Sequence, residues 1–274
     1  MAWRRSVGER FAGVDRHAHR AYAQFQRALF AVRLSADLRS LGRYLRVESR
    51  WARAEPVSVR VRPLGGAPIR LRPGTSDALV LRETLRDKHH SPPPEIAARG
   101  VRNIVDLGAN VGITVADNAL THPGARIVAV ELDPGNAETA RRNCAPWAER
   151  CQILQGAVWV ADGEVAYERG AGGEQGFTVV DGRDGARTRA LSMQTILAHV
   201  PRGERVDYMK MDIEGVERRL LSGGEAGWAE RIDSIALQVH DPYTLEECAR
   251  DLAGLGFEPR VDGRRMNYIV GVRR

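Results

Sequence analysis

The sequence predicts an α/β fold built on a parallel sheet, and two patterns lead to that prediction. From residue 101 onward, apolar runs of strand length alternate with stretches whose apolar residues recur at helical spacing. Such alternation is typical of parallel strands joined by helices that cover both faces of a sheet. The chain ends differently, because two strand-like runs are joined there by the turn-like DGR, which predicts a closing antiparallel pair.

The expected elements of this core follow one another in a regular order. The strands are VRNIVDL, ARIVAVE, CQILQGAV, VDYMKMD and DSIALQV, with FEPRV and MNYIVGV at the end. The helices are ITVADNAL, PGNAETARRNCA, LSMQTILAHV and LEECARDLAGLG. An insertion from Glu164 to Ala190 interrupts the alternation, and its strand-like runs predict an extra hairpin.

Residues 15–50 form a predicted helical segment with two apolar stripes. One stripe contains Tyr22, Phe25, Leu29, Val32 and Ala36, and the other contains Leu34, Leu38, Leu41 and Leu45. At about 100° per residue the two stripes lie nearly opposite each other. We therefore expect the helix to break near Ser35 and Asp37, both good N-cap residues. The alternative is one helix buried on two sides.

A hairpin and a short helix are expected between this segment and the core. Residues 57–72 show strand alternation on both sides of PLGGAP, which predicts the hairpin. Thr75, Ser76 or Asp77 can then cap a short helix. The expected parts of the chain are an Arg-rich helical extension (1–55), the hairpin and short helix (56–94) and the core domain (95–274).

Positive charge is concentrated at the N-terminal end of the sequence. The first 55 residues contain twelve arginines and five acidic residues, whereas the whole chain has a net charge of +6. Such a segment could bind a nucleic acid, an anionic membrane surface or an acidic partner protein. A solvated helical face is the simpler interpretation.

The sequence also indicates a location. No apolar run approaches the ~18–20 residues that a membrane-spanning helix needs, and the first residues lack the apolar stretch of a secretory signal. The three cysteines, Cys144, Cys151 and Cys248, lack the spacing of a zinc or redox motif. We expect buried thiols in a cytoplasmic protein.

A glycine-rich turn, VDLGANVG (residues 105–112), lies between an expected strand and an expected helix. There it would present backbone N–H groups to a ligand at a helix N-terminus. Gly108 permits a tight turn, Gly112 permits close approach of the backbone, and Asn110 tolerates a positive φ. A dinucleotide-binding turn has a glycine where this chain has Asp106. A carboxylate repels a pyrophosphate but suits the cationic amine of S-adenosylmethionine.

A second acid supports this ligand. Glu131 ends the next expected strand, where a carboxylate can accept hydrogen bonds from both ribose hydroxyls. The simpler alternatives are that Asp106 caps a helix and that Glu131 is solvated. Because both acids occur together with the turn, we predict that Asp106, Gly108, Ala109, Asn110, Gly112 and Glu131 bind S-adenosylmethionine.

From RPGTSD through VDLGANVG, AVELDPGN, KMDIEGVE and the QVHD strand end, the sequence resembles the FkbM family of S-adenosylmethionine-dependent methyltransferases. The resemblance covers roughly residues 70–260. It implies a class I methyltransferase fold with a Rossmann-like sheet of seven strands, the last antiparallel, in the domain at 95–274. It also implies O-methylation of a hydroxyl, often on a sugar, glycan or secondary metabolite, and cofactor contacts from Thr75 and Asp77.

The acceptor side of the site is expected at two further strand ends. Asp212 and Glu214 follow the fourth strand, and His240 follows the fifth. His240 has a suitable pKa for a general base, although a structural role is equally credible. In a variant, Asp212, Glu214 and His240 hold Mg²⁺, which lowers the pKa of the hydroxyl. Family members often carry an acid where this chain has Gln238, which weakens that variant.

Two charged residues near these acids are expected to have structural roles only. Lys210 is expected to keep a neighbouring acid ionised. Glu217 is expected only to complement a helix N-terminus.

Other functions remain open at this level. The Arg-rich segment would suit a nucleic-acid methyltransferase, but KMDIEG lacks the proline-aromatic sequence that holds a flipped base. The chain could also be a non-catalytic scaffold that contacts a partner, or forms a homo-oligomer, through residues 1–55. A nicotinamide dehydrogenase is disfavoured by Asp106. The sequence does not identify the small-molecule or glycan acceptor, the general base of the reaction or its metal dependence.

Overall fold

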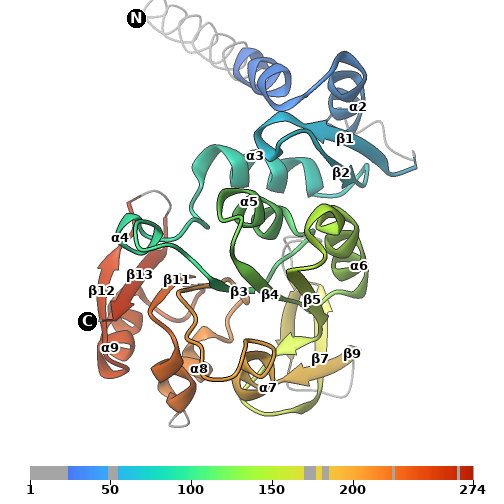
Figure 1. Cartoon of the computed structure of the whole chain (residues 1–274). Coiled ribbons are helices and arrows are strands. Elements are labelled where there is room, and N and C mark those ends of the chain that lie inside the picture. The colour runs from blue at the N-terminus through green and yellow to red at the C-terminus, as the bar shows by residue number, and fades with distance from the viewer. Residues whose placement is uncertain are drawn as a thin grey trace, which may run out of the picture. The chain divides into compact units, whose positions relative to one another are not determined.

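The computed structural model of the 274-residue chain describes residues 24–48, 55–169, 177–180, 185–223, 226–263 and 266–273 (Figure 1). Two compact units are present, Met1–Pro73 and Gly74–Arg274. The hairpin therefore groups with the N-terminal helices, and the short helix after it groups with the core. The predicted division of the chain into an extension (1–55), a hairpin with a short helix (56–94) and a methyltransferase domain (95–274) stays a prediction.

The described residues of the first unit form two helices and a hairpin. Residues 24–34 are helical, and after a break α2 runs over Leu38–Glu48. The break predicted near Ser35 and Asp37 is confirmed, since Ser35 bridges to Val61 and the Asp37 carboxylate accepts the Ser40 N–H at 2.7 Å. The predicted hairpin is also confirmed, with β1 (Val57–Val61) antiparallel to β2 (Ala67–Leu71) and a short 3₁₀ turn between them.

The second unit is built on a seven-stranded sheet. Its strands are β3 (Asn103–Leu107), β4 (Arg126–Glu131), β5 (Cys151–Gln155), β10 (Tyr208–Met211), β11 (Ser234–Gln238), β12 (Phe257–Val261) and β13 (Tyr268–Arg273). Their spatial order is β12-β13-β11-β10-β3-β4-β5, and β13 is antiparallel to both neighbours. The prediction of seven strands with the last antiparallel is therefore confirmed.

Helices cover both faces of this sheet. They are α3 (Asp77–Asp87), α4 (Pro94–Ala97), α5 (Ile113–Thr121), α6 (Pro134–Asn143), α7 (Met193–Leu197), α8 (Glu217–Ser222) and α9 (Leu245–Gly254). Figure 1 shows α5 and α6 on one face and α7, α8 and α9 on the other. Strand alternation separates the two cores, because Met209 and Met211 pack with the α7–α9 side and Tyr208 packs with the α5–α6 side.

The insertion is larger than the predicted hairpin. It forms a four-stranded sheet with the order β6-β9-β7-β8, from β6 (Ala157–Val158), β7 (Gly163–Arg169), β8 (Phe177–Val180) and β9 (Ala186–Leu191). The antiparallel pair β7–β8 is the expected hairpin. The added strands follow from pairing of β9 with β7 and β6, which sequence alternation does not reveal.

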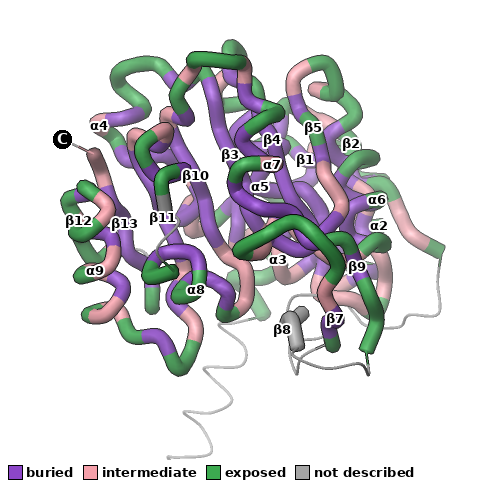
Figure 2. Tube along the Cα trace, turned by 90° about the horizontal axis from the view of Figure 1, so that it is seen from below, coloured by how far each residue is buried: buried purple, intermediate pink, exposed green. Residues whose placement is uncertain are grey.

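The strands at the middle of the seven-stranded sheet are buried along their length, as Figure 2 shows for β3 and β10. These strands, with β4 and β11, run parallel, so their carboxyl ends meet at one edge. Ligands of open α/β sheets bind at this edge. The residues predicted to form the site leave the sheet there.

Candidate active site

The glycine-rich loop joins β3 to α5 in a conformation that depends on its glycines. Gly108 has a φ of 84°, Asn110 of 50°, and Gly112 of 79° at the N-cap of α5. A Cβ on Gly108 would lie 1.8 Å from the backbone oxygen of Asp212. The loop therefore touches the end of β10, and only glycine permits that approach.

Glu131 lies at the end of β4 and holds this loop. Its Oε2 accepts the Asn110 N–H at 2.7 Å, and its Oε1 accepts the Asp133 N–H at 3.0 Å. Its side chain is largely buried, with 6% of the residue exposed. Burial raises the pKa of Glu131 to about 7, because the loss of hydration outweighs the hydrogen bonds that favour the carboxylate.

Asp106 lies beneath the loop and is fully buried. Its Oδ1 is 3.0 Å from the Lys210 Nζ, and its Oδ2 accepts a hydrogen bond from the Thr114 hydroxyl. Lys210 also donates to the Gly108 carbonyl oxygen at 2.8 Å. Both Asp106 oxygens are thus engaged within the protein, and a direct contact of Asp106 with the cofactor amine stays a prediction.

Lys210 is the buried cation that balances these acids. Burial alone would lower the pKa of Lys210, but the charges of Asp106 and Asp212 outweigh it and raise the pKa. The Asp212 carboxylate is farther from Lys210 than Asp106 is, at 3.9 Å. Lys210 is therefore paired mainly with Asp106, in agreement with its expected role beside an acid.

Thr75 and Asp77, the other two predicted cofactor residues, are at the start of α3, where the Thr75 hydroxyl accepts the Asp77 N–H at 3.2 Å and Ser76 is the N-cap residue. Their cofactor role stays a prediction.

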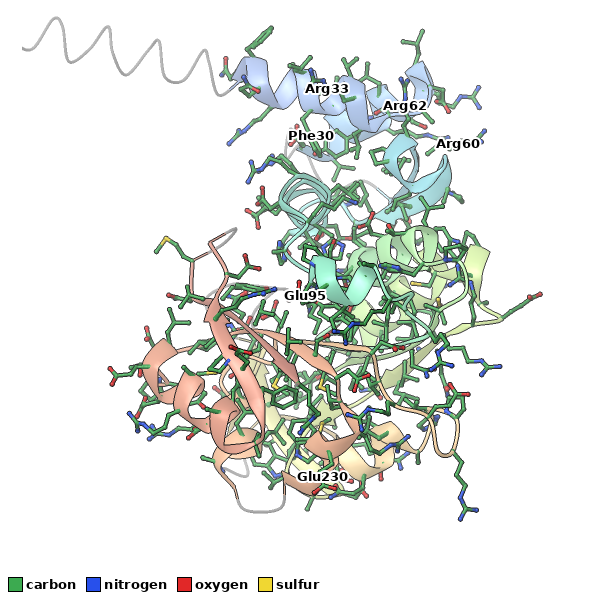
Figure 3. All side chains as sticks on the ribbon, turned by 60° about the vertical axis from the view of Figure 1, so that its left-hand side comes forward. Phe30, Arg33, Arg60, Arg62, Glu95 and Glu230 are labelled. Carbon is green, nitrogen blue, oxygen red and sulfur yellow. The ribbon has the colours of Figure 1, made fainter. Side chains whose placement is uncertain are left out.

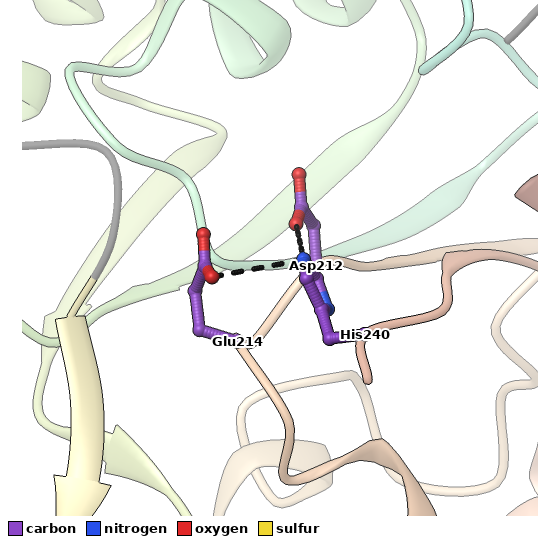
Figure 4. Close-up of side chains that lie close together, drawn as sticks. All are labelled: Asp212, Glu214 and His240. Carbon is purple, nitrogen blue, oxygen red and sulfur yellow. Dashed lines mark ion pairs between the residues drawn. The ribbon is translucent and has the colours of Figure 1, made fainter. Parts of the chain in front are cut away.

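Asp212, Glu214 and His240 meet at the same sheet edge. The His240 Nε2 is 3.6 Å from the Asp212 Oδ1 and 3.7 Å from the Glu214 Oε2, as Figure 4 shows. All three residues are half-buried, and their ligand atoms lie within 4.8 Å of one another. Asp212 and Glu214 follow β10, and His240 follows β11, so parallel pairing of two strands brings these residues together.

Glu217, the first residue of α8, has a larger role than the sequence indicated. It is fully buried, and its carboxylate accepts the N–H groups of Ile213 at 3.1 Å and Gly215 at 2.8 Å. Its Oε1 is also 2.8 Å from the His240 Nδ1. Glu217 therefore fixes both the loop that carries Glu214 and the ring of His240. The sequence did contain a signal for this role. Glu217 closely follows the turn at Gly215, at the same sheet edge as His240.

The cluster is strongly acidic around its one imidazole. Burial alone would lower the pKa of His240, but Glu217, Asp212 and Glu214 together raise it to about 9. Burial raises the pKa of Glu214, although the charge of His240 opposes this effect. At neutral pH the ligand-free cluster therefore holds a proton on His240.

The cluster also suits a divalent cation. Asp212, Glu214 and His240 would hold such an ion, because their ligand atoms lie within 4.8 Å of one another. The other ring nitrogen of the histidine is held by the Glu217 carboxylate, as is usual for histidines that bind metals. Among the residues described by the structure, no other such group occurs in which His, Cys, Asp or Glu converge.

The family model of the methyltransferase FkbM domain matches residues 106–259. The chain belongs to the FkbM methyltransferase family. The match begins at Asp106 and includes the glycine-rich loop, Glu131 and all three residues of the acidic cluster. The resemblance inferred from the motifs is confirmed, and with it the prediction of a methyltransferase.

One curated relative and two solved structures illustrate the range of similarity. The O-methyltransferase imqG of Aspergillus flavus is 28% identical over 170 residues, which span 56% of this chain and 66% of the relative. The cofactor-bound structure of Rv0187 from MTB has 13% identity and a TM-score of 0.42, covering 88% of this chain and 92% of that chain. An O-methyltransferase family protein from Burkholderia thailandensis has 13% identity and a TM-score of 0.43, covering 72% and 59%.

Within the described residues, no helix combines the length and apolar character that a membrane span requires.

Proposed function

We propose that this FkbM-family chain transfers the methyl group of S-adenosylmethionine to a hydroxyl oxygen of a sugar, glycan or secondary metabolite. The observation that supports this most is the contact between Gly108 and the backbone of Asp212. It makes the glycine-rich loop continuous with the acidic cluster. A cofactor held by the loop and an acceptor held by the cluster would therefore be neighbours, as methyl transfer requires.

The cofactor side is assigned to the loop and to Glu131. The ionised carboxylate of Glu131 is proposed to accept both ribose hydroxyls, while the Asn110 N–H keeps it oriented. Asp106 and Lys210 hold the loop from below through the Gly108 carbonyl oxygen. These residues bind and orient the cofactor but do not take part in proton transfer.

The acceptor side is assigned to Asp212, Glu214 and His240. The acceptor hydroxyl is proposed to donate a hydrogen bond into this cluster, which aligns its oxygen for in-line displacement. The pKa of His240 falls when a cationic cofactor lies beside the cluster. The neutral imidazole then accepts the hydroxyl proton at Nε2, because Glu217 holds the proton on Nδ1.

A Mg²⁺ ion held by Asp212, Glu214 and His240 would supply Lewis-acid activation of the hydroxyl. In that case His240 would be a metal ligand and would not act as the general base. Comparing turnover with and without Mg²⁺ separates the two versions. The cytoplasm stays the proposed location, and a homo-oligomeric state stays open.

Calorimetric titration with S-adenosylhomocysteine tests the cofactor assignment. Wild-type protein is expected to bind, and Glu131→Ala is expected to bind at least tenfold more weakly, because hydrogen bonds to a charged group contribute about 1.5–3 kcal/mol each. Glu138→Ala, which removes an exposed acid of α6, is the matched control. Equal affinity of the Glu131 variant, or tighter binding of NADH, would contradict the assignment.

The acceptor class is tested by release of S-adenosylhomocysteine in the presence of monosaccharides, glycosides and phenols. Release that depends on one of these hydroxyl compounds and is lost in Asp212→Asn supports O-methylation. Transfer only to amines or to RNA would overturn it.

A further inference from the structure

The helix over residues 24–34 is apolar on two faces, only one of which is covered. Ala31 and Leu34 are buried, at 0% and 1% exposure. At about 100° per residue the opposite side carries Phe25, Ala28, Leu29 and Val32, and of these Phe25 is 62% and Val32 54% exposed. Of the apolar stripe predicted from the sequence, Phe25 and Val32 are therefore exposed and Leu29 and Ala36 partly exposed, while Tyr22 lies outside the described residues.

Helix α2 also has exposed apolar side chains. Its buried side is formed by Ser40, Tyr44 and Val47, whereas Leu38 is 86% and Leu45 43% exposed. Exposed apolar side chains are common singly, but recurrence at helical spacing on two successive helices is typical of a docking face.

Arginines flank these apolar side chains. The described residues of this unit include nine arginines and three acidic residues. The exposed arginines are Arg27, Arg33, Arg39, Arg43, Arg46, Arg60 and Arg62. Arg39, Arg43 and Arg46 recur at helical spacing on α2, and the Arg43 guanidinium donates to the Ser58 carbonyl oxygen at 2.9 Å.

The hairpin adds to this positive charge. Figure 3 labels Arg33, Arg60 and Arg62, and the Arg62 guanidinium donates to the Ser35 carbonyl oxygen at 3.0 Å, close to the break between the two helices. Arg60 donates to the Gly66 carbonyl oxygen at 3.2 Å. Backbone carbonyl oxygens are neutral partners, so these contacts do not cancel the guanidinium charges, although the Asp37 carboxylate lies close enough to Arg60 to offset part of its charge.

The combination of exposed apolar side chains and arginines distinguishes between possible binding partners of these helices. A second copy of the same surface would bring its own excess of arginines, and like charges would oppose that association. A nucleic acid matches the charge, but solvated Leu and Val side chains gain little from it, since bases are recognised by stacking and hydrogen bonds. At a lipid interface, by contrast, apolar side chains enter the acyl boundary while arginines meet the phosphates.

We propose that the docking surface, formed by Phe25, Val32, Leu38 and Leu45 with the exposed arginines around them, binds an anionic phospholipid membrane. This is peripheral binding through exposed side chains of two successive helices. It is independent of the acceptor proposed above, because none of these residues belongs to the candidate active site.

Vesicle flotation with the full chain tests this inference. The vesicles consist of phosphatidylcholine alone or of phosphatidylcholine mixed with phosphatidylglycerol. Wild-type protein is expected to float only with the anionic vesicles and to be released by salt, because the charge contribution is screened. Removing three arginines in Arg39→Gln/Arg43→Gln/Arg46→Gln is expected to weaken binding by roughly a hundredfold, since each basic residue near the surface contributes about a factor of five.

A second variant tests the apolar contribution. Phe25→Ser/Val32→Ser is expected to lower vesicle binding at least tenfold while retaining the wild-type circular dichroism spectrum, because both side chains are exposed. The matched control is Val261→Ser, at a position of β12 that is 63% exposed in the other unit, and it should bind as wild type does. Arg202→Gln, at an exposed position of that unit, is the charge control.

Three outcomes would overturn the proposal. The first is absence of flotation with anionic vesicles. The second is salt-sensitive binding to single-stranded RNA without vesicle binding, which would identify a nucleic-acid surface. The third is a dimer in sedimentation equilibrium that dissociates in Phe25→Ser/Val32→Ser, which would identify a second copy as the occupant.

Discussion

The glycine-rich loop and the acidic cluster lie at the same sheet edge but differ in how their charges are satisfied. Both Asp106 oxygens have partners inside the protein, and Glu131 accepts two backbone N–H groups. In the cluster, the His240 Nε2 is 3.6 Å and 3.7 Å from its two acids, beyond ordinary hydrogen-bond distance.

This difference separates a preorganised glycine-rich loop from a cluster whose charges are only partly paired. A satisfied network holds one geometry, because any movement would break buried hydrogen bonds. The cluster instead has three carboxylates, Asp212, Glu214 and Glu217, around one imidazole. An acceptor hydroxyl or a cation would complete it.

The largest expected effect comes from breaking the loop network at Lys210. Lys210→Met leaves Asp106 buried without its cation, and removing one partner of a buried ion pair typically costs about 3–5 kcal/mol. Urea unfolding is the measurement, and Arg187→Met, which breaks the exposed pair with Glu164, is the control at about 0–1 kcal/mol. A loss in Lys210→Met no larger than in the control would show that the network is not what holds the loop.

In the cluster, removal of His240 is expected to lower turnover and also to lower stability. His240→Ala should lower kcat by about a hundred- to ten-thousand-fold, the usual contribution of a general base. Because His240 is 2.8 Å from the fully buried Glu217 carboxylate, its removal leaves that charge without its partner, and the midpoint of urea unfolding should fall as well, so kcat is measured on the folded protein. Unchanged kcat with the acceptor found by screening would assign His240 a structural role.

Glu217 is a buried residue that also contacts His240. Its substitution is expected to lower turnover less than removal of His240 does. Glu217→Gln removes the charge that raises the pKa of His240, so that pKa should fall from about 9 toward 6.5 when ring protons are followed by NMR in metal-free buffer. Turnover should fall by about ten- to a hundredfold, as for other residues that orient a histidine. An unchanged His240 pKa with lower stability would indicate a structural role alone.

The mildest test varies pH at the cofactor loop. The pKa of Glu131 is about 7 in the ligand-free protein, and the ionised carboxylate is the form proposed to accept the ribose hydroxyls. Affinity for S-adenosylhomocysteine should therefore be constant above pH 7 and fall roughly tenfold for each pH unit below it. Glu131→Gln should bind weakly with no such dependence. A dependence retained in that variant would assign the titration to another group.

The stability of the protein should depend on the ionisation of Glu131 in the opposite direction to cofactor affinity. An acid whose pKa rises on folding, here from 4.5 to about 7, holds its proton longer in the native state than in the unfolded chain. The contribution of Glu131 to the free energy of unfolding is therefore present at low pH and is lost as pH rises from 4.5 to 7. Binding and stability should thus respond to pH in opposite directions.

Much of the fold was predictable, because local patterns report strand and helix directly. The alternation from residue 101 predicted the strands of the seven-stranded sheet, and the DGR turn predicted the antiparallel end. The break before α2 followed from two opposed stripes and a capping residue. The positions of Asp212, Glu214 and His240 at one edge followed from parallel pairing, since parallel strands end on the same side.

Other features depend on contacts between distant residues, which periodicity does not report. Lys210 could have paired with any nearby acid, and only the register of β10 beside β3 places it on Asp106, 104 positions earlier in the chain. The same is true of Glu217, whose bond to His240 requires α8 and the end of β11 to meet. The insertion is part of a four-stranded sheet because β9 pairs with both β6 and β7.

By itself, the sequence determined the fold class, the family and the residues of the glycine-rich loop and the acidic cluster, since these follow from spacing along one strand–turn–helix unit or from parallel strand ends. The tertiary structure alone decided which charges neutralise one another and which apolar stripes are covered. Phe25 and Val32 have the same helical spacing as a core face, yet they are exposed. Periodicity identifies a face, and only packing against another element determines whether that face is buried.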